Sequence, residues 1–519
     1  MQKVLTAEEM REVDRLTTEN YGIPSIILME NAAHAVARVI AKKLGGSVKD
    51  KSFLILCGKG NNGGDGAALA RVLWSLGAWV DVFLFGSFDQ TKGDARSNFE
   101  TLARLGADEE PLIYFNEEGD FESWRKRNLS RETFDVVVDA IFGTGLTGPV
   151  ESPLADILAG RWFQEKKFRD CASLVVAIDV PSGLDADWNE RIGDCVRTDL
   201  TVTFTAPKLA NVLPPASNFG GELWVANIGS PPELIEDTSS QTFLAENIDA
   251  NYWTSQTEFF SDSYKNKRGK ALLIAGSIKY SGAGVLVGNG AMQSGVGLVT
   301  VVTSESARNA VSERILPEVM VEGVAETETG SISESAYERI DELSAKADVI
   351  GIGSGLGSDE GSTRNLVRKV VEERKTPVVI DADGLNALSP FDLEGAETPP
   401  LILTPHEGEF LRLLGTDDKD VLKDRVQAVR DFAEKHNVIL VLKGERTLIG
   451  EPGGKVVINP TGNSGLGKAG NGDNFTGIIT GFVAQVVQMD VNVFETVVAA
   501  VYIAGLAGDF AEKKFGKRT

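Results

Sequence analysis

Cysteine, histidine and long apolar runs are scarce in this sequence, and each shortage excludes a class of protein. The three cysteines, Cys57, Cys171 and Cys195, form no disulfide framework and no metal-type spacing, which favours a reducing compartment. No run of about 18 apolar residues is present, so no membrane span is expected. The N-terminus has mixed charge and lacks the apolar core of a signal peptide. These absences together predict a cytoplasmic protein.

Positive charge is also in short supply, because 75 acidic residues outnumber 52 basic ones and give a net charge of -23 at pH 7. A chain this acidic repels nucleic acid and anionic membranes. No interleaving of aromatic and basic residues supports nucleic-acid binding either. A small anionic ligand is still compatible with the sequence, because a local loop can outweigh the global charge.

Strand-like and helix-like apolar segments alternate through the chain, which at 519 residues is too long for one core. This alternation predicts parallel sheets with helices on both faces. Pro231, Pro232 and the polar residues after them interrupt it. We therefore expect an α/β protein with two three-layer domains, 1–235 and 245–519, and a linker at 236–244. The expected strands lie at 53–56, 80–85, 136–142, 174–180, 200–205 and 223–228, then at 241–244, 271–275, 298–302, 349–352, 377–381, 401–404, 438–442 and 455–458.

The stretch 52–71 carries the densest glycines of the first half. A short apolar strand is followed by five glycines between positions 58 and 66, and a helix is expected from Ala67. This geometry points backbone N–H groups at an anion. Asn61, Asn62 and Asp65 add oxygens that suit a cation or a sugar hydroxyl. The alternative is a tight turn without a ligand. The spacing matches neither the dinucleotide fingerprint nor the P-loop.

Two further strand ends carry carboxylates, Asp139 and Asp179, and glycine-rich loops follow both. Ligands of open α/β sheets lie outside the carboxyl ends of the strands, so the three loops should converge there. Asn62, Asp139 and Ser182 could bind one monovalent or hard cation. Asp179 is the best acid–base candidate. Turn caps at the strand ends are the alternative for both carboxylates, and Lys208 is either a phosphate contact or a surface lysine.

Three motifs of the first half together resemble the NAD(P)HX epimerase domain: residues 61–66 (NNGGDG), 139–145 (DAIFGTG) and 179–183 (DVPSG). The resemblance implies a Rossmann-like domain that interconverts the two C6 epimers of hydrated NADH and NADPH. It also implies a potassium ion on Asn62, Asp139 and Ser182. The residues that it places on the hydrated nucleotide are Asn61, Asn62, Gly63, Gly64, Asp65, Gly143, Thr144, Gly145, Leu146, Thr147, Gly148, Pro149 and Asp179.

The sharpest motif of the second half is the glycine-rich stretch 462–473, which enters a predicted helix at 474–487. Gly470, Gly472 and the helix N-terminus form an anion hole. Asp473 is placed to deprotonate a hydroxyl beside that hole. A first-turn helix charge would explain Asp473 but not the glycines. His406 follows another strand end beside two glutamates, where a substrate contact and a structural role are equally open.

TPHEGEF (404–410), KGERT (443–447) and GNSGLGKAGNGD (462–473) together resemble the NAD(P)HX dehydratase domain, a ribokinase-like fold. The resemblance implies that ADP phosphorylates the C6 hydroxyl, with release of AMP and phosphate, and that magnesium assists. It implies Asp473 as the base, with Gly355 and His406 at the hydrated ring or its ribose. The implied nucleotide contacts are Lys443, Gly444, Glu445, Arg446, Thr447, Gly462, Asn463, Ser464, Gly465, Leu466, Gly467, Lys468, Ala469, Gly470, Asn471 and Gly472.

Both resemblances together imply a bifunctional repair enzyme that epimerises NAD(P)HX and dehydrates the S epimer at the expense of ADP. The expected partners are NADHX, NADPHX and ADP, in a homo-oligomer without nucleic acid or membrane. One rival is a ribokinase-like small-molecule kinase fused to a nucleotide-binding regulatory domain. Another is a regulatory protein with a degenerate first domain, against which Asp179 and the complete set Asn62, Asp139 and Ser182 argue.

Overall fold

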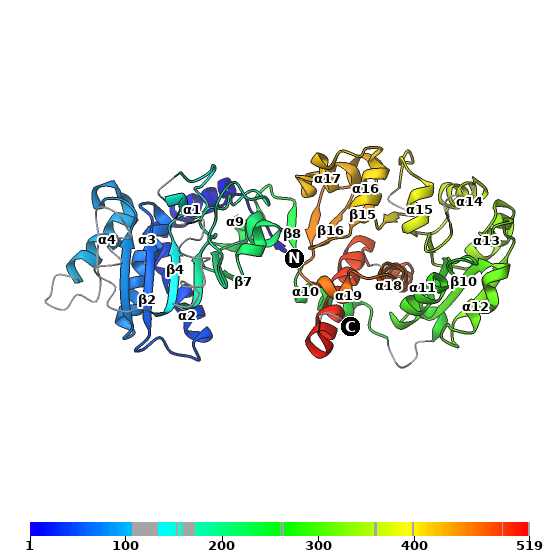
Figure 1. Cartoon of the computed structure of the whole chain (residues 1–519), viewed down its shortest axis with the longest axis horizontal. Coiled ribbons are helices and arrows are strands. Elements are labelled where there is room, and N and C mark those ends of the chain that lie inside the picture. The colour runs from blue at the N-terminus through cyan, green and yellow to red at the C-terminus, as the bar shows by residue number, and fades with distance from the viewer. Residues whose placement is uncertain are drawn as a thin grey trace. The chain divides into compact units, whose positions relative to one another are not determined.

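The computed structural model describes residues 1–105, 133–151, 154–156, 158, 172–259, 261, 264–357, 361–396, 399–489 and 491–516, so Cys171 lies outside the described part. The chain forms two compact units (Figure 1). The first unit is Lys3–Ser240. The second is Gln241–Thr519 together with Met1–Gln2.

The first unit is built on a six-stranded parallel sheet with the strand order β3-β2-β4-β5-β6-β7. Each strand begins and ends within two residues of the range expected from its apolar run, so the predicted parallel sheet is confirmed. The strands are β2 (Ser52–Cys57), β3 (Trp79–Leu84), β4 (Phe134–Ala140), β5 (Ala172–Ile178), β6 (Leu200–Phe204) and β7 (Glu222–Ala226).

The central strands of this sheet are buried on both faces, because alternate residues of a strand such as β2 enter different cores. Phe53 and Ile55 of β2 belong to the core that α2, α3 and α4 cover, whereas Leu54 and Leu56 belong to the opposite one. This two-sided burial explains why the sequences of central strands such as β2 and β5 are almost continuously apolar. The helices of the unit include α1 (Ala7–Tyr21), α2 (Ser25–Lys43), α3 (Asn61–Ser75), α4 (Gly93–Leu105), α6 (Leu154–Asp156), α8 (Leu209–Val212) and α9 (Pro232–Glu236).

The second unit has an eleven-stranded sheet with the order β1-β8-β17-β16-β15-β14-β13-β12-β9-β10-β11. In sheet order, the strands β11, β10, β9, β12, β13, β14 and β15 are parallel to one another. Strand β16 is antiparallel to both of its neighbours, β15 and β17. The apolar pattern did not predict β1, β11 and β16. The strands are β1 (Gln2–Lys3), β8 (Thr242–Leu244), β9 (Lys270–Ile274), β10 (Leu298–Ser304), β11 (Met320–Val324), β12 (Val349–Ile352), β13 (Val378–Ile380), β14 (Leu401–Leu403), β15 (Ile439–Leu442), β16 (Leu448–Gly450) and β17 (Val456–Ile458).

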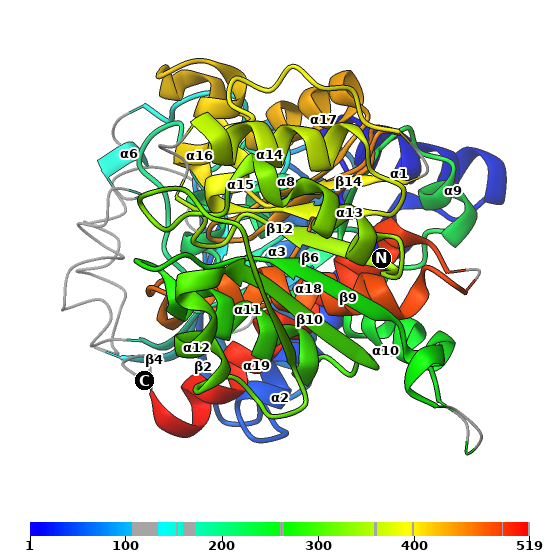
Figure 2. The same cartoon turned by 90° about the vertical axis from the view of Figure 1, so that its right-hand side faces the viewer.

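Helices cover both faces of this second sheet. Figure 2 shows α13 to α17 on one side of it and α10, α11, α12, α18 and α19 on the other. This is the three-layer α/β arrangement expected from the sequence. The helices are α10 (Asn247–Gln256), α11 (Ser281–Gln293), α12 (Arg308–Ser312), α13 (Tyr337–Ser344), α14 (Gly361–Glu372), α15 (Ala382–Ala387), α16 (Glu407–Leu414), α17 (Arg425–His436), α18 (Asn471–Val486) and α19 (Val493–Phe515).

Helix α19 is the one described helix that is long and apolar enough to cross a membrane by length and composition. Phe494, Val497 and Val501 of α19 lie in the core of the second unit, and the helix packs against α18 and α10. Burial in a core accounts for the same composition. The absence of a membrane partner therefore stays a prediction.

The residues expected to form a linker are divided between the two units. Helix α9 ends at Glu236, and the hydroxyl of Ser240 donates to the carbonyl oxygen of Val4 at 2.6 Å, within the first unit. Strand β8 then pairs with β17 of the second sheet. The weak strand expected at 241–244 is therefore confirmed.

Candidate functional site

Helix α3 begins at Asn61, directly after β2, rather than at Ala67 as expected. The expected glycine turn is therefore mostly helix, and its glycines serve close packing. A Cβ atom on Gly63 would lie 1.7 Å from the carbonyl oxygen of Gly58. One on Gly66 would lie 2.6 Å from the Cβ of Ala140. The glycines thus let α3 lie directly on the sheet, with its N-terminus at the carboxyl end of β2.

Asp179 and Lys208 form a buried ion pair at the ends of β5 and β6. The ammonium of Lys208 donates to Oδ1 of Asp179 at 2.7 Å, to the hydroxyl of Thr203 at 2.9 Å and to the carbonyl oxygen of Phe204 at 3.2 Å. Lys208 is 1% exposed, so the interpretation as a surface lysine was wrong. Asp179 has a left-handed backbone with φ 68°, and Asn211 donates to its carbonyl oxygen at 3.1 Å.

The second carboxylate oxygen of Asp179 faces Gly143, the first glycine of the loop after β4. A Cβ atom on Gly143 would lie 3.3 Å from Oδ2 of Asp179 and 3.2 Å from Oδ1 of Asn62. The fold thus brings Asn62, Gly143 and Asp179 together, as predicted for convergent loops. In the described part of the chain, both polar side-chain atoms of Asn62 are buried and lack a hydrogen-bond partner.

Asp139 and Ser182 are joined by two hydrogen bonds. The hydroxyl of Ser182 donates to Oδ1 of Asp139 at 2.5 Å, and its backbone N–H donates to Oδ2 at 2.8 Å. Asp139 is fully buried, and burial raises its pKa to about 6, although the bonds from Ser182 oppose that shift. The N–H of Phe142 donates to the hydroxyl of Ser182 at 2.8 Å, which ties both residues to the loop after β4.

Asp65 lies in the second turn of α3, and burial raises its pKa well above the ordinary value. Asp179 and Asp14 strengthen this shift, whereas Lys208 opposes it. Asp14 lies on α1 and was not predicted to be near the site, because the sequence of α1 has the pattern of an ordinary amphipathic helix. The rest of the loop after β4, from Thr144 through Gly145, Leu146, Thr147 and Gly148 to Pro149, is half-buried or exposed.

A cavity of about 830 Å³ opens in the second unit at the N-terminus of α18. All of the predicted nucleotide contacts line it except Gly465, Lys468, Ala469 and Gly470. Gly470 has φ 88° and precedes the first residue of α18, so it permits the entry into the helix. The lining residues that the sequence did not single out are Asn459, Pro460, Thr461, Asn474, Phe475, Ile478, Val501, Ala504 and Gly505.

The glycine-rich loop over this cavity is fixed by two side chains. Asp509 of α19 accepts the N–H of Gly462 at 2.9 Å and the amide of Asn463 at 3.0 Å. The amide of Asn471 donates to the carbonyl oxygen of Leu466 at 2.6 Å. Asn471 therefore has a structural partner within the loop, and Asp509 is a further residue that the sequence pattern missed.

Asp381 accepts hydrogen bonds from three side chains beside the cavity. It is buried at the end of β13 and accepts from Lys443 at 2.6 Å, from Thr476 at 2.7 Å and from Thr404 at 2.9 Å. A Cβ atom on Gly472 would lie 3.8 Å from Oδ2 of Asp381. A carboxylate, an ammonium and a glycine at the helix N-terminus thus meet at one place.

Asp473 lies in the first turn of α18, as its position after the glycines predicted. Burial raises its pKa above the ordinary value, and the Asp381 carboxylate adds to the shift, while the Lys443 ammonium opposes it. A half-buried carboxylate next to an anion-binding helix end is suited to accept a proton from a hydroxyl.

His406 lines the cavity and also caps a helix. Its Nδ1 accepts the N–H of Glu409 at 3.1 Å, at the start of α16, and Glu409 accepts the N–H of His406 at 2.9 Å. Gly355 does not line the cavity. A Cβ atom on Gly355 would lie 2.7 Å from the Cβ of Ala283, so a glycine at this position allows the close approach to α11. Its φ of 66° also favours glycine.

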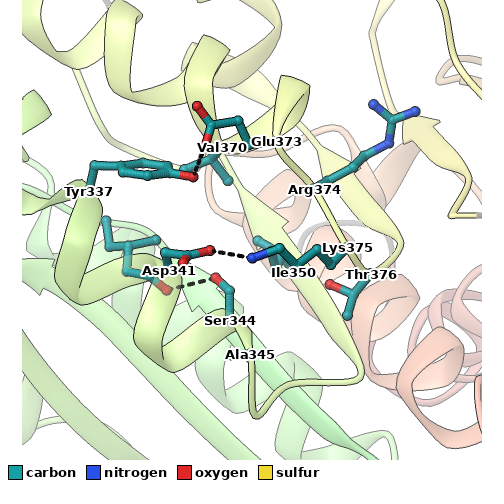
Figure 3. Close-up of a pocket in the computed structure, with 11 residues that line it drawn as sticks. Tyr337, Asp341, Ser344, Ala345, Ile350, Val370, Glu373, Arg374, Lys375 and Thr376 are labelled. Carbon is teal, nitrogen blue, oxygen red and sulfur yellow. Dashed lines mark hydrogen bonds and ion pairs between the residues drawn. The ribbon is translucent and has the colours of Figure 1, made fainter.

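A much smaller cavity of about 20 Å³ lies against α13 and the end of α14 (Figure 3). The hydroxyl of Tyr337 donates to Glu373 at 2.6 Å, and the ammonium of Lys375 donates to Asp341 at 3.4 Å. A cavity of this size holds about one water molecule. We assign no ligand to it.

Two family models match the chain, one described as YjeF-related protein N-terminus over residues 25–210 and one as NAD(P)H-hydrate dehydratase over residues 271–519. The bifunctional NAD(P)H-hydrate repair enzyme Nnr of Moorella thermoacetica is 38% identical over 518 residues, which cover 99% of this chain and 93% of the relative. Its namesake in Thermofilum pendens is 36% identical over 518 residues, with the same coverage.

Among solved structures, the ADP/ATP-dependent NAD(P)H-hydrate dehydratase of Bacillus subtilis, co-crystallised with ATP/Mg2+, is 30% identical. It covers 52% of this chain and 91% of its own, with a TM-score of 0.45. The two relatives matched over nearly the whole chain establish the family. The chain belongs to the bifunctional NAD(P)H-hydrate repair enzymes, which combine an NAD(P)H-hydrate epimerase with an ADP-dependent NAD(P)H-hydrate dehydratase.

Proposed function

We propose that the first unit holds the epimerase site and that Asp179 is its acid–base group. The observation that carries this proposal is the asymmetry of the carboxylate, because Lys208 holds Oδ1 and Oδ2 is open toward Gly143. A carboxyl group anchored in this way gives up a proton and takes one back at a fixed place. The hydrated nicotinamide ring would lie between Asp179 and the residues 61–65 and 143–149.

Epimerisation at C6 requires the C6–O bond to break and to form again on the other face of the ring. The electron pair of the ring nitrogen forms the C6=N1 double bond, while the hydroxyl takes a proton and departs as water. Water then adds to the opposite face and loses one proton. Asp179 gives the first proton and recovers the second, so the enzyme returns to its starting state.

We propose that a potassium ion binds beside this site. The buried and unpartnered amide of Asn62 supports an ion there, because buried polar groups normally have partners. Asn62, Asp139 and Ser182 would hold the ion with amide, carboxylate and hydroxyl oxygens. When bound, the ion supplies a positive charge at the carboxyl end of the sheet.

In the second unit we assign ADP to the cavity of about 830 Å³ and Asp473 to the hydrated ring. Phe475, Ile478 and Val501 give the cavity an apolar wall that suits a flat base. Lys443 and the N-terminus of α18 offer positive charge for phosphates. His406 would reach the substrate from the rim, whereas the packing of Gly355 against Ala283 favours a supporting role.

Dehydration then proceeds by phosphoryl transfer. Asp473 takes the proton of the C6 hydroxyl, the hydroxyl oxygen attacks the β-phosphorus of ADP, and AMP leaves. The C6–O bond of the phosphate ester breaks with release of phosphate, and loss of a proton from C5 gives NAD(P)H. No described group of three or more His, Cys, Asp or Glu side chains is arranged for a metal ion, so magnesium would be held by the phosphates and Glu445. It would neutralise phosphate charge.

Separate variants of the full chain test this division of labour. Asp179→Asn should stop conversion of R-NADHX to S-NADHX and leave dehydration of purified S-NADHX unchanged. Asp473→Asn should have the opposite effect. Chromatography resolves the epimers, and NADH absorbance reports dehydration. Loss of both activities from either variant, with an unchanged melting temperature, would overturn the assignment.

A further inference from the structure

Asp14 is an acidic residue on the buried side of an amphipathic helix. The buried residues of α1 are Ala7, Met10, Val13 and Thr17, and Asp14 directly follows Val13 on that side. Its Oδ1 atom is buried and has no hydrogen-bond partner among the described residues. Enclosing a carboxylate oxygen in this way costs free energy. Packing alone therefore does not account for Asp14.

Residues in and just before helix α1 pack with the neighbours of the ion pair in the proposed epimerase site. Leu5, just before the helix, donates its N–H to the carbonyl oxygen of Pro207 at 3.0 Å. Val13 packs in one cluster with Ala206. These contacts place the middle of α1 beside Lys208, which follows Pro207 in the chain.

The first turn of α1 makes a similar contact with the other member of the ion pair. Ala7 belongs to the same buried cluster as Val180, the residue after Asp179. The helix thus packs with the residues next to both members of the ion pair, and Asp14 directly follows Val13, one of the packing residues.

The charges of four groups interact at this place: those of Asp14, Asp65, Asp179 and Lys208. These four groups comprise three carboxyl groups and the single ammonium of Lys208. The three protons of that ammonium are already donated to Asp179, Thr203 and Phe204. Burial raises the pKa of Asp14 to about 6, with Lys208 opposing the shift and Asp179 adding to it. On the outer side of the same helix, Arg11 and Arg15 are exposed.

We propose that Asp14 is a positioning residue of the epimerase, which acts through Lys208 and supplies its counter-charge while Asp179 is protonated. The proposal rests on the assignment of the epimerase site to Asp179. When Asp179 gains a proton from the adding water, Asp14 releases one to solvent, and the charge around Lys208 stays constant. When Asp179 returns its proton to the departing hydroxyl, Asp14 takes one back from solvent.

The test compares Asp14→Asn with Glu12→Gln, a control on the exposed side of the same helix, where Glu12 is paired with Arg15 at 2.7 Å. The measurement is kcat and KM for conversion of purified R-NADHX to S-NADHX between about pH 5 and pH 8, a range that brackets the usual titration of raised carboxyl groups. Asp14→Asn should lower kcat about tenfold, less than a direct proton-transfer group would, and leave KM within about twofold. It should also flatten the pH profile, and Asp14→Glu should restore most of kcat.

Urea unfolding of each variant reports whether the first unit is folded, and dehydration of S-NADHX by the same protein reports on the second unit. An unchanged kcat and pH profile in Asp14→Asn, with a wild type that epimerises, would overturn the role of Asp14 and leave the proposed function intact. A wild type without epimerisation would overturn the proposed function itself. If Asp14→Asn loses both activities, Asp14→Glu decides, because an epimerisation kcat that stays low in Asp14→Glu while dehydration is normal would contradict the proposal.

Discussion

The ammonium of Lys208 lies 2.7 Å from Oδ1 of Asp179, and the side chains are 1% and 13% exposed. Water solvates neither charge well, so each charged group is stabilised mainly by the other. The pair also fixes the direction of the carboxylate, since Lys208 and Thr203 both donate to Oδ1.

Replacing Lys208 by Met should therefore affect both stability and epimerisation. Asp179 would be left buried without its counter-charge, which costs about 3–5 kcal/mol of unfolding free energy for a buried pair. Conversion of R-NADHX should fall by about 100-fold or more, because the acid–base group loses its orientation. Urea unfolding and epimer-resolved chromatography measure the two effects. Dehydration of S-NADHX serves as the control in the same chain, and a variant that epimerises at the wild-type rate would refute the role of the pair.

The dehydratase should lose activity on the acid side through Asp473. Burial raises the pKa of Asp473, and a base acts only in its deprotonated form. Activity should accordingly fall as the pH drops through that raised pKa, above the ordinary aspartate value of about 3.9. Asp473→Asn should lower dehydration by about 10²–10⁴ and remove this acid limb. A variant that keeps the limb would assign it to another group.

Two glycines of the first unit make a matched pair for testing why α3 begins so early. A Cβ atom on Gly63 would lie 1.7 Å from the carbonyl oxygen of Gly58, whereas one on Gly60 would have no atom within 4 Å. Gly63→Ala should destabilise the first unit by about 3 kcal/mol or more and lower epimerisation. Gly60→Ala should change neither beyond about 0.5 kcal/mol. Equal melting temperatures for the two variants would contradict the close contact of α3 with the loop that follows β2.

Potassium should stabilise the first unit through Asn62. A ligand that binds only the folded state at 100 times its Kd adds about 2.7 kcal/mol. The melting temperature should rise when potassium chloride replaces lithium chloride at equal ionic strength, and Asn62→Ala should remove most of the rise. If the variant keeps the full rise, the ion is bound elsewhere.

Most strands could be predicted from sequence because they are buried on both faces and are therefore largely apolar. The strands β1 (Gln2–Lys3) and β11 (Met320–Val324) lack this pattern and were not predicted. The convergence of Asn62, Gly143 and Asp179 followed from the rule that loops meet at the carboxyl ends of parallel strands. The start of α3 could not be predicted, since the glycines that allow close packing on the sheet look locally like a turn.

The roles of other residues could not be predicted because their partners are far away in the sequence. Lys208 is hydrophilic by type, and only the fold shows that Asp179 and Thr203 surround it. Asp381 looks like an ordinary strand end until Thr476 and Lys443 reach it from other elements. Asp509 lies in an apolar helix, and its contact with the loop at Gly462 depends on how that helix packs.

The most direct test of the two-site account is the recovery of NADH absorbance from a mixture of both NADHX epimers with magnesium, with ADP and ATP in separate reactions. The wild-type chain should convert both epimers completely with ADP, on a timescale on which uncatalysed epimerisation is negligible. Recovery that stops when one epimer is used up would contradict the epimerase site in the first unit. No recovery with either nucleotide would contradict the dehydratase site in the second.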